Sequence, residues 1–358
     1  MKKIKNIRKK NLLIALFFPI LILASGCFQV KKQAPVPAAG AYKSFDRGVT
    51  WQPKRNLVTP VGYKALTNIN ILLMRIDPQD NNAIYMGTES NGIYYSYNGG
   101  EYWEQPYQLN VGKINDIAID PKDKCIIYVA FSNQLFKTDD CNRSWNQVFI
   151  DPRPKILVTG IAVNPLNSKI IYISTDFGEV IKSVNGGIPW TTIQRFNKTI
   201  LKTLINPHNP LILYALVHQK GIYKSTDGGE TWKSVSLDLK KYPNSLLSPQ
   251  LFINPAQNDG LILISKFGIL KTDDGGDSWK ALNLITPPSG TDILSFSINP
   301  QNDKEMYYGT SSTVYATVNG GESWTVKKLP TNAQSSFIIQ DPVNPSILYL
   351  GTKTIITK

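Results

Sequence analysis

The chain has 358 residues and a formal net charge of +13, from 39 Lys and Arg against 26 Asp and Glu. Six basic residues fall in the first ten positions, so the rest of the chain carries 33 basic and 26 acidic residues, a balance of +7. This mild excess contains no dense Lys/Arg cluster, which argues against nucleic acid as the partner.

Residues 1–26 have the pattern of a secretory signal peptide. The basic stretch 1–10 precedes an apolar run over 11–24, and small residues lead directly into Cys27. The apolar run is short for a transmembrane helix. The Leu-Ala-Ser-Gly-Cys sequence resembles a bacterial lipobox, in which Cys27 would be acylated and become the mature N-terminus. The alternative is an uncleaved signal anchor with an incidental cysteine.

Export and lipid anchoring set the expected organisation of the chain. Residues 27–40 mix Pro, Ala and Gln without periodicity, which predicts an extended lipidated tether. The expected location is the outer face of a bacterial membrane, either the cell membrane or the outer membrane. Residues 41–358 form a single repeat array.

An eight-residue box occurs seven times in that array, and its clearest copy is STDGGETW at 225–232. The third position always holds Asp or Asn: Asp46, Asn98, Asp140, Asn185, Asp227, Asp274 and Asn319. The last position holds every tryptophan of the chain: Trp51, Trp103, Trp145, Trp190, Trp232, Trp279 and Trp324. Successive copies lie 42 to 52 residues apart, a spacing typical of repeat architectures.

Each box is interpreted as a hairpin corner. The Asx side chain can accept hydrogen bonds from backbone amides two residues on. Glycine supplies a positive φ, and the tryptophan buries a large ring at the start of the next strand. Asn142 replaces this glycine in the third copy, which is tolerable because Asn visits the left-handed region. We therefore expect a structural role for the seven Asx residues.

A second motif, Asx-Pro after an alternating apolar run, keeps step with the box from 77–78 to 341–342. The proline ends a first strand, and runs such as AIYMGT (83–88) and GIYKS (221–225) predict a second and a third. A fourth strand follows the tryptophan. Four short strands in each unit of about 45 residues predict the blade of a β-propeller.

The order of the motifs predicts how the propeller closes. A box comes first and an Asx-Pro unit comes last, with seven of each. We therefore expect an all-β, single seven-bladed propeller whose last blade combines outer strands from 41–55 with inner strands from 335–357. Tyr42-Lys43 and Ile355-Ile356 both fit the third strand of that blade, and the sequence leaves the choice open.

Cys125 and Cys141 flank the second and third strands of one unit. Opposed residues of an antiparallel hairpin lie within disulfide reach, and an exported protein permits the bond. We predict a disulfide, and the alternative is two free thiols.

The boxes resemble Asp-box (BNR) repeats over essentially all of 41–358. Such repeats occur in sialidases, sortilin-type receptor domains, xyloglucanase-like glycosidases and the photosystem II stability/assembly factor family. The last family is similar in length and in the order of its motifs. This resemblance implies an exported, non-catalytic, seven-bladed scaffold. We extend the family's scaffold to this chain but not its photosystem partner.

A carbohydrate-active hydrolase or a glycan-binding propeller is the alternative. A sialidase would need three arginines on the central face, and no such trio is evident among Arg75, Arg143, Arg153 and Arg195. A xyloglucanase-like enzyme would need carboxylates across a cleft. Asp176 and Glu179 are the first candidates, followed by Glu89, Asp116 and Asp292. No partner residues accompany them at a motif spacing, which favours solvated loop acids.

The favoured function is a non-catalytic protein-binding or assembly scaffold, monomeric, with a protein or glycan partner. Six residues in predicted turns of one face are the candidate contacts: Lys113, Phe177, Gln219, Lys220, Lys266 and Phe267. The alternative is that these are ordinary solvated turns. His208 and His218 flank one strand and should face opposite ends of the blade, so neither a metal nor a cofactor is expected.

Overall fold

The structure, a computed structural model, describes residues 39–354. The predicted signal peptide, Cys27, most of the tether and Ile355-Ile356 lie outside the described residues. Within 39–354 no helix is long and apolar enough to cross a membrane.

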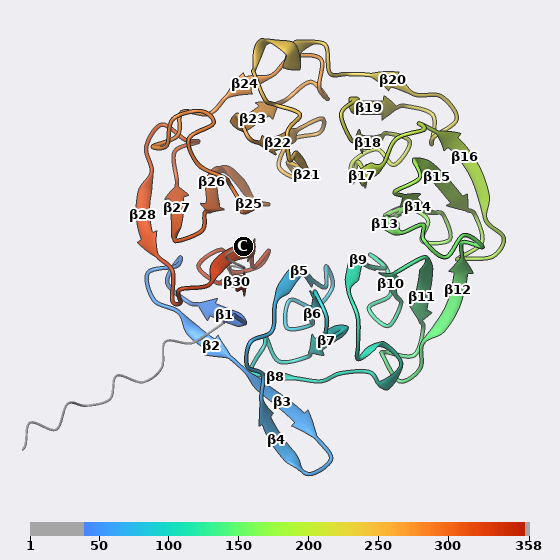
Figure 1. Cartoon of the computed structure of the whole chain (residues 1–358), viewed down its shortest axis with the longest axis vertical. Coiled ribbons are helices and arrows are strands. Elements are labelled where there is room, and N and C mark those ends of the chain that lie inside the picture. Colours follow the sequence, from blue (N-terminus) through green and yellow to red (C-terminus); the bar gives the residue numbers. More distant parts are fainter. Residues whose placement is uncertain (1–38, 355–358) are drawn as a thin grey trace, which may run out of the picture. The chain divides into compact units, whose positions relative to one another are not determined.

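The described chain is a β-propeller built from six four-stranded and two three-stranded sheets, whose strands pair antiparallel except for β3 and β8. The sheets are arranged around a central axis, with the first strand of each unit nearest to it (Figure 1). These innermost strands are β5 (Ile71–Ile76), β9 (Ile114–Ile119), β13 (Val158–Val163), β17 (Ile200–Ile205), β21 (Gln250–Ile253), β25 (Ser295–Asn299) and β29 (Gln334–Gln340).

The second strands are the most buried, because both faces of the sheet pack against neighbouring sheets there. They are β6 (Ile84–Thr88), β10 (Ile127–Phe131), β14 (Ile171–Thr175), β18 (Leu213–Val217), β22 (Leu261–Ser265), β26 (Asn302–Gly309) and β30 (Leu348–Lys353). The third strands are β7 (Ile93–Ser96), β11 (Gln134–Thr138), β15 (Glu179–Ser183), β19 (Gly221–Ser225), β23 (Gly268–Thr272), β27 (Thr313–Thr317) and β1 (Ala41–Ser44). The outer strands are β2 (Gln52–Lys54), β12 (Asn146–Ile150), β16 (Thr191–Arg195), β20 (Lys233–Ser234), β24 (Lys280–Ala281) and β28 (Thr325–Lys328).

One sheet combines strands from both ends of the domain, in the order β2-β1-β30-β29. Strand β1 pairs antiparallel with β30, with Ala41 opposite Gly351 and Ser44 opposite Leu348. Tyr42-Lys43 therefore takes the third-strand position in this sheet.

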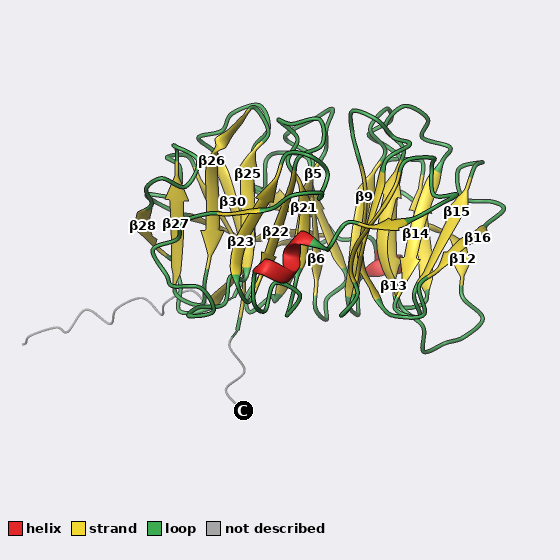
Figure 2. Ribbon diagram, turned by 90° about the horizontal axis from the view of Figure 1, so that it is seen from above, coloured by secondary structure: helices red, strands yellow, loops and turns green. Residues whose placement is uncertain are grey.

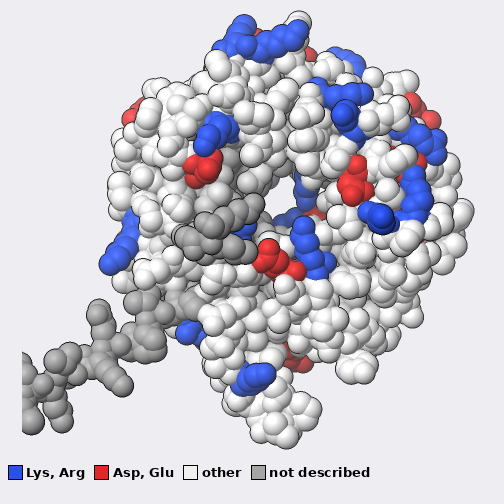
Figure 3. Space-filling model, in the orientation of Figure 1, with Lys and Arg blue, Asp and Glu red and all other residues white. Residues whose placement is uncertain are grey.

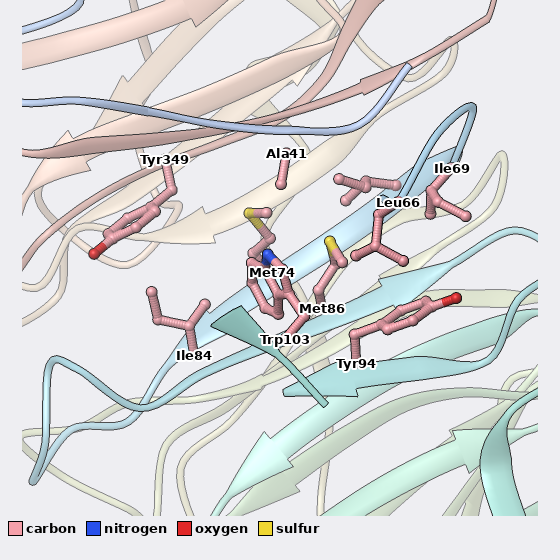
Figure 4. Packing of buried hydrophobic residues seen from close by; sticks show 10 residues of the cluster. Ala41, Leu66, Ile69, Met74, Ile84, Met86, Tyr94, Trp103 and Tyr349 are labelled. Carbon is pink, nitrogen blue, oxygen red and sulfur yellow. The ribbon is translucent and has the colours of Figure 1, made fainter. Parts of the chain in front are cut away.

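Aromatic and aliphatic side chains fill the spaces between adjacent sheets. Figure 4 shows one such cluster, in which Met74, Met86 and Trp103 are fully buried. Tyr349 of β30 joins the same cluster, so the cluster links the β5-β6-β7 sheet to the β2-β1-β30-β29 sheet.

One unit departs from the four-strand prediction. The sheet β5-β6-β7 has three strands, because β8 (Tyr102–Trp103) pairs in parallel with β3 (Asn56–Thr59). Glu104, the residue after β8, forms an isolated antiparallel bridge with Tyr95 of β7. The hairpin of β3 and β4 (Gly62–Ala65) is an insertion, and it accounts for the longest box spacing, 52 residues.

The box forms a corner with a different hydrogen-bond pattern from the one expected. Asp227 accepts from the backbone amide and the hydroxyl of Thr231, four residues on rather than two. The Ser225 hydroxyl donates to Asp227 and accepts from the Gly229 amide at 2.9 Å. The carboxylate thus spans the whole turn, since the glycines at positive φ bring the fourth amide back to it.

Two copies of the box are variants. Asn142 adopts the expected positive φ of 69°, and its amide donates to the hydroxyl of Tyr97 at 2.6 Å. In the fourth copy Pro189 occupies the seventh position of the box, where Thr231 of the clearest copy donates its backbone N–H to the Asx side chain. Proline has no N–H, so Asn185 cannot make that bond.

The strand order places the loops on two faces, which are the two edges of the strands in Figure 2. One face carries the boxes and the Asx-Pro loops. The other carries the turns between second and third strands and the loops that lead into the innermost strands, and we call it the B–C face. Both short 3-10 segments, η1 (Tyr107–Leu109) and η2 (Asp238–Lys241), lie in loops of this face.

Candidate functional site

All six predicted contact residues lie on the B–C face, but they do not form a single cluster. Lys113 precedes β9 and Phe177 lies in the β14–β15 turn. Gln219 and Lys220 form the exposed β18–β19 turn. Phe267, in the β22–β23 turn with Lys266, is half-buried because it packs edge-on against Tyr242 at 5.2 Å. The turn at 219–220 and the region around Phe267 therefore both adjoin the long loop 235–249.

A groove of about 780 Å³ lies between the 219–220 turn and that loop. Its lining residues are Gln219, Lys220, Ser234, Ser236, Leu237, Leu239, Lys240, Tyr242, Pro243, Asn244, Ser245, Leu246 and Leu247. Among the described residues this lining contains two lysines and no carboxylate.

Hydrogen bonds hold the loop that forms one wall of the groove. The Tyr242 hydroxyl donates to the Trp279 carbonyl at 2.6 Å, and the Trp279 amide donates to Asp238 at 2.9 Å. The Ser245 hydroxyl donates to the Leu239 carbonyl at 3.0 Å. The wall is thus attached to the next blade, so a ligand entering the groove would not have to order it.

The surface of the groove combines positive charge with exposed aliphatic side chains. Leu237 and Leu247 are 77% and 52% exposed, and Lys220 and Lys240 are exposed beside them. Lys and Arg gather at the top of Figure 3, over the part of the domain that holds η2 in Figure 1. Gln219 is held at a φ of 60°, a conformation that non-glycine residues adopt only where the surrounding structure imposes it.

A second cavity, of about 1010 Å³, runs between the innermost strands and opens at the centre of Figure 3. Its wall is largely aliphatic, with one charged cluster. Asp116 of β9 is 1% exposed and pairs with Arg75 of β5 at 2.8 Å and Lys202 of β17 at 2.7 Å. The Ile161 amide also donates to Asp116 at 3.0 Å. This cluster ties four innermost strands together.

The cluster sets the ionisation of its members. Burial opposes the charge of Asp116, but Lys202 and Arg75 outweigh it and lower the pKa of that carboxyl. Burial lowers the pKa of Lys202, and Asp116 only partly offsets this effect. The group as a whole holds two cations against one anion.

A second charged cluster lies under the B–C face. Glu179 is 5% exposed, with Arg153 at 2.5 Å on one oxygen and Arg195 at 3.1 Å on the other. Arg153 also binds Asp151 through two hydrogen bonds, and these lower the pKa of Asp151. The same guanidinium lies 4.5 Å from the ring centre of Phe177, which fixes an exposed aromatic ring on this face.

The expectation of solvated loop acids is wrong for Asp116 and Glu179, which are buried ion-pair members. The other candidates also have partners. Glu89 accepts from the Asn70 amide group at 2.7 Å, Asp176 accepts from the Leu157 backbone N–H at 2.8 Å, and Asp292 pairs with Lys266 at 2.7 Å.

The two histidines lie at opposite ends of β18, and no three His, Cys, Asp or Glu residues within 39–354 are grouped to hold a metal. Cys125 and Cys141 are joined in a disulfide, with their Cα atoms 4.0 Å apart.

Comparisons with known proteins confirm the resemblance to Asp-box propellers. A family model described as Sortilin-Vps10 (sortilin, neurotensin receptor 3) matches residues 178–284, a segment that includes the whole groove. No curated protein matches the chain in sequence.

The similar solved structures include enzymes and a peptide-bound protein. The GH74 enzyme of Niastella koreensis is 18% identical (TM-score 0.62), and the GH74 xyloglucanase of Xanthomonas campestris is 14% identical (TM-score 0.67). Each alignment covers 80% of this chain but only 53% and 51% of the enzymes, so the chain spans about half their length. YCF48 bound to D1 peptide is 15% identical (TM-score 0.61), and the alignment covers 81% of this chain and 94% of YCF48. At these identities the likeness is one of fold.

Proposed function

We propose that the protein is an exported scaffold, anchored by acylated Cys27, that binds a partner protein through the B–C face. The partner supplies an extended segment with acidic and apolar side chains, which lies in the groove beside the 219–220 turn. The scaffold is a seven-bladed ring, closed by the sheet that combines β1 and β2 with β29 and β30.

The groove is the observation that carries this proposal. It is preformed, it offers leucines next to Lys240 and Lys220, of which Lys220 donates to the Phe196 carbonyl at 2.8 Å, and it lies on the face predicted for binding. Lysines at such a rim attract and orient an acidic segment, and the leucines supply apolar contact area. The peptide-bound YCF48 structure supports the general mode, since a propeller of matching length holds a peptide.

Hydrolysis of a glycan is the second candidate function, and the likeness to GH74 enzymes is the observation that favours it. The candidate carboxylates oppose it. Both oxygens of Glu179 accept from arginine, and one oxygen of Asp176 accepts from a backbone amide. Turnover of a glycan by the purified protein, abolished by Asp176→Asn, would replace the scaffold proposal.

The decisive experiment places a photo-crosslinking amino acid at Leu247 in the groove and, as a control, at Leu166 on the opposite face. Leu166 is 67% exposed, comparable to the 52% of Leu247. We expect one membrane protein to be captured from Leu247 and not from Leu166.

The charge of the groove provides the matched variant. Lys240→Glu should reduce capture and lower the affinity for the identified segment about tenfold, equivalent to about 1.4 kcal/mol. Lys124→Glu makes the same charge change on the face of the Asx-Pro loops and should have no effect. Equal capture from both faces, or equal loss in both charge variants, would contradict the proposal.

A further inference from the structure

The inserted hairpin β3–β4 contacts the propeller core through Leu57, which is partly buried against the cluster of Met74, Met86 and Trp103, and the rest of the hairpin extends away from it. It projects outward from the rim in Figure 1, next to β2. All four residues of β4 are exposed, and a side chain added at Gly62 would meet nothing within 4 Å. The hairpin therefore presents its tip, Pro60-Val61, and its outer strand entirely to the surroundings.

The large exposed hydrophobic side chains of this hairpin are two valines and a tyrosine, beside the polar Asn56 and Lys64. Val61 at the tip is 98% exposed, Tyr63 70% and Val58 43%. Val58 and Tyr63 are opposed residues of the ladder, so they lie on the same side of it. Tyr102 of β8 stacks on Tyr63 at 5.1 Å and extends this ridge.

The chain outside the described residues indicates what this ridge meets. Ala39 leads into β1, β1 pairs with β2, and β2 leads directly into the hairpin. Eleven residues lie between Cys27 and Ala39, and the twelve Cα–Cα steps limit the distance from the acylated residue to Ala39 to about 40 Å. Among the outer strands of the described sheets, β2 is the first along the chain after Cys27, and the hairpin follows β2 directly.

The composition suits a lipid surface better than a second copy of the chain. Tyrosine is favoured at the boundary between lipid headgroups and acyl chains, and Lys64 can bury its stem while its ammonium stays in the headgroup layer. Lys64 on the edge strand and Pro60 in the turn also discourage edge-to-edge pairing between sheets.

We infer that the β3–β4 hairpin is a second membrane contact, which inserts Val61 and Tyr63 into the lipid interface and fixes the orientation of the propeller on the bilayer. This inference rests on the proposed lipid anchoring. An acyl anchor on an extended tether leaves the domain free to turn, whereas a second contact on its rim orients the domain edge-on.

The test uses a cysteine label at the tip. Because Cys27 would be acylated and Cys125 is bonded to Cys141, Val61→Cys supplies a unique thiol for the environment-sensitive fluorophore NBD. Leu166→Cys provides the matched label on an exposed loop far along the chain. The acylated, NBD-labelled proteins are incorporated into phosphatidylglycerol/phosphatidylethanolamine vesicles. Their NBD emission is compared with that of the same labelled proteins made without the acyl anchor, in buffer without detergent or vesicles.

We expect a blue shift and an intensity gain for the label at 61 and none at 166. No shift at 61 in protein that floats with the vesicles would overturn the inference, as would equal shifts at both positions. A concentration-dependent shift without vesicles would instead identify a second copy as the occupant, and would also overturn it.

A second arm separates the inference from the anchoring on which it rests. A histidine tag replaces residues 1–27 and holds the chain on vesicles that contain a nickel-chelating lipid, which keeps the tether length without acylation. If the native chain fails to float but the tagged chain shows the shift at 61, acylation is wrong and the hairpin contact stands. If the native chain floats and neither form shows the shift, the anchoring stands and the hairpin contact is wrong.

Discussion

Removing the charge of Asp116 tests how the innermost strands are held together. Asp116→Asn keeps the size of the side chain but leaves Arg75 and Lys202 close to each other without their shared anion. Removing one member of a buried ion pair costs about 3–5 kcal/mol, because the remaining charge is left uncompensated. The side chains of Arg75 and Lys202 are 29% and 25% exposed, so water relieves part of this cost. We expect a loss of about 3 kcal/mol, at the lower end of the range.

The dependence on pH follows from the lowered pKa of Asp116. A carboxyl with a lowered folded-state pKa contributes stability that is complete above its unfolded pKa of about 3.9 and is lost as the pH falls through the folded value. The difference in stability between wild type and Asp116→Asn should therefore be largest near neutral pH and shrink at pH values below about 4.

Urea denaturation at several pH values measures both effects, with Asp139→Asn as the control. Asp139 also pairs with a lysine, but at 3.5 Å and with 59% exposure, so its loss should cost about 0.5 kcal/mol or less. Combining Asp116→Asn with Lys202→Met should give a coupling free energy of at least about 0.5 kcal/mol. Equal costs for the two Asn variants, or a coupling near zero, would refute the argument.

Three further changes test local features of the fold. Cys125→Ser opens a loop with a sequence separation of 16 and should lower the free energy of unfolding by about 3 kcal/mol, measured by urea midpoint with and without reductant. Burial opposes the charge of Asp274, but hydrogen bonds within its box lower its pKa to about 2. Asp274→Ala should thus reduce stability above pH ~4, and the difference from wild type should disappear towards pH 2. Gly92→Ala would place a Cβ 1.9 Å from the Leu109 carbonyl oxygen, so its thermal midpoint should fall further than that of Gly62→Ala, which has a positive φ but open space.

The repeating corner made the architecture predictable from the sequence. Its hydrogen bonds join residues at most four positions apart, so each copy of the motif carries its own geometry. The strand order followed from the alternation of the box with the Asx-Pro motif. The choice between Tyr42-Lys43 and Ile355-Ile356 required the structure, because both segments have the same strand character and only pairing with β30 distinguishes them.

The charged clusters could not be predicted in the same way. Arg75, Asp116 and Lys202 are separated by 41 and 86 residues, and they meet because each occupies an innermost strand. The sequence did offer one signal for this cluster, because each of its three residues is a charged residue within an otherwise largely apolar first strand. The spacing of the boxes gave a second signal, since the intervals of 52 and 47 residues mark the inserted hairpin and the groove loop. A longer interval between boxes indicates that a unit contains inserted residues, but it does not indicate what those residues contact.

The distribution of carboxylates bears directly on the choice between binding and hydrolysis. A glycosidase needs two carboxyl groups whose oxygens are free to face the scissile bond. Here the acids considered for that role have other partners: Asp116 and Glu179 hold cations below the surface, and Asp176 holds a backbone amide. The preformed groove contains lysines and leucines and no acid among its described lining residues. A groove lined by lysines and leucines is suited to hold an acidic segment, and the three acids named above each have at least one carboxylate oxygen bound by a partner.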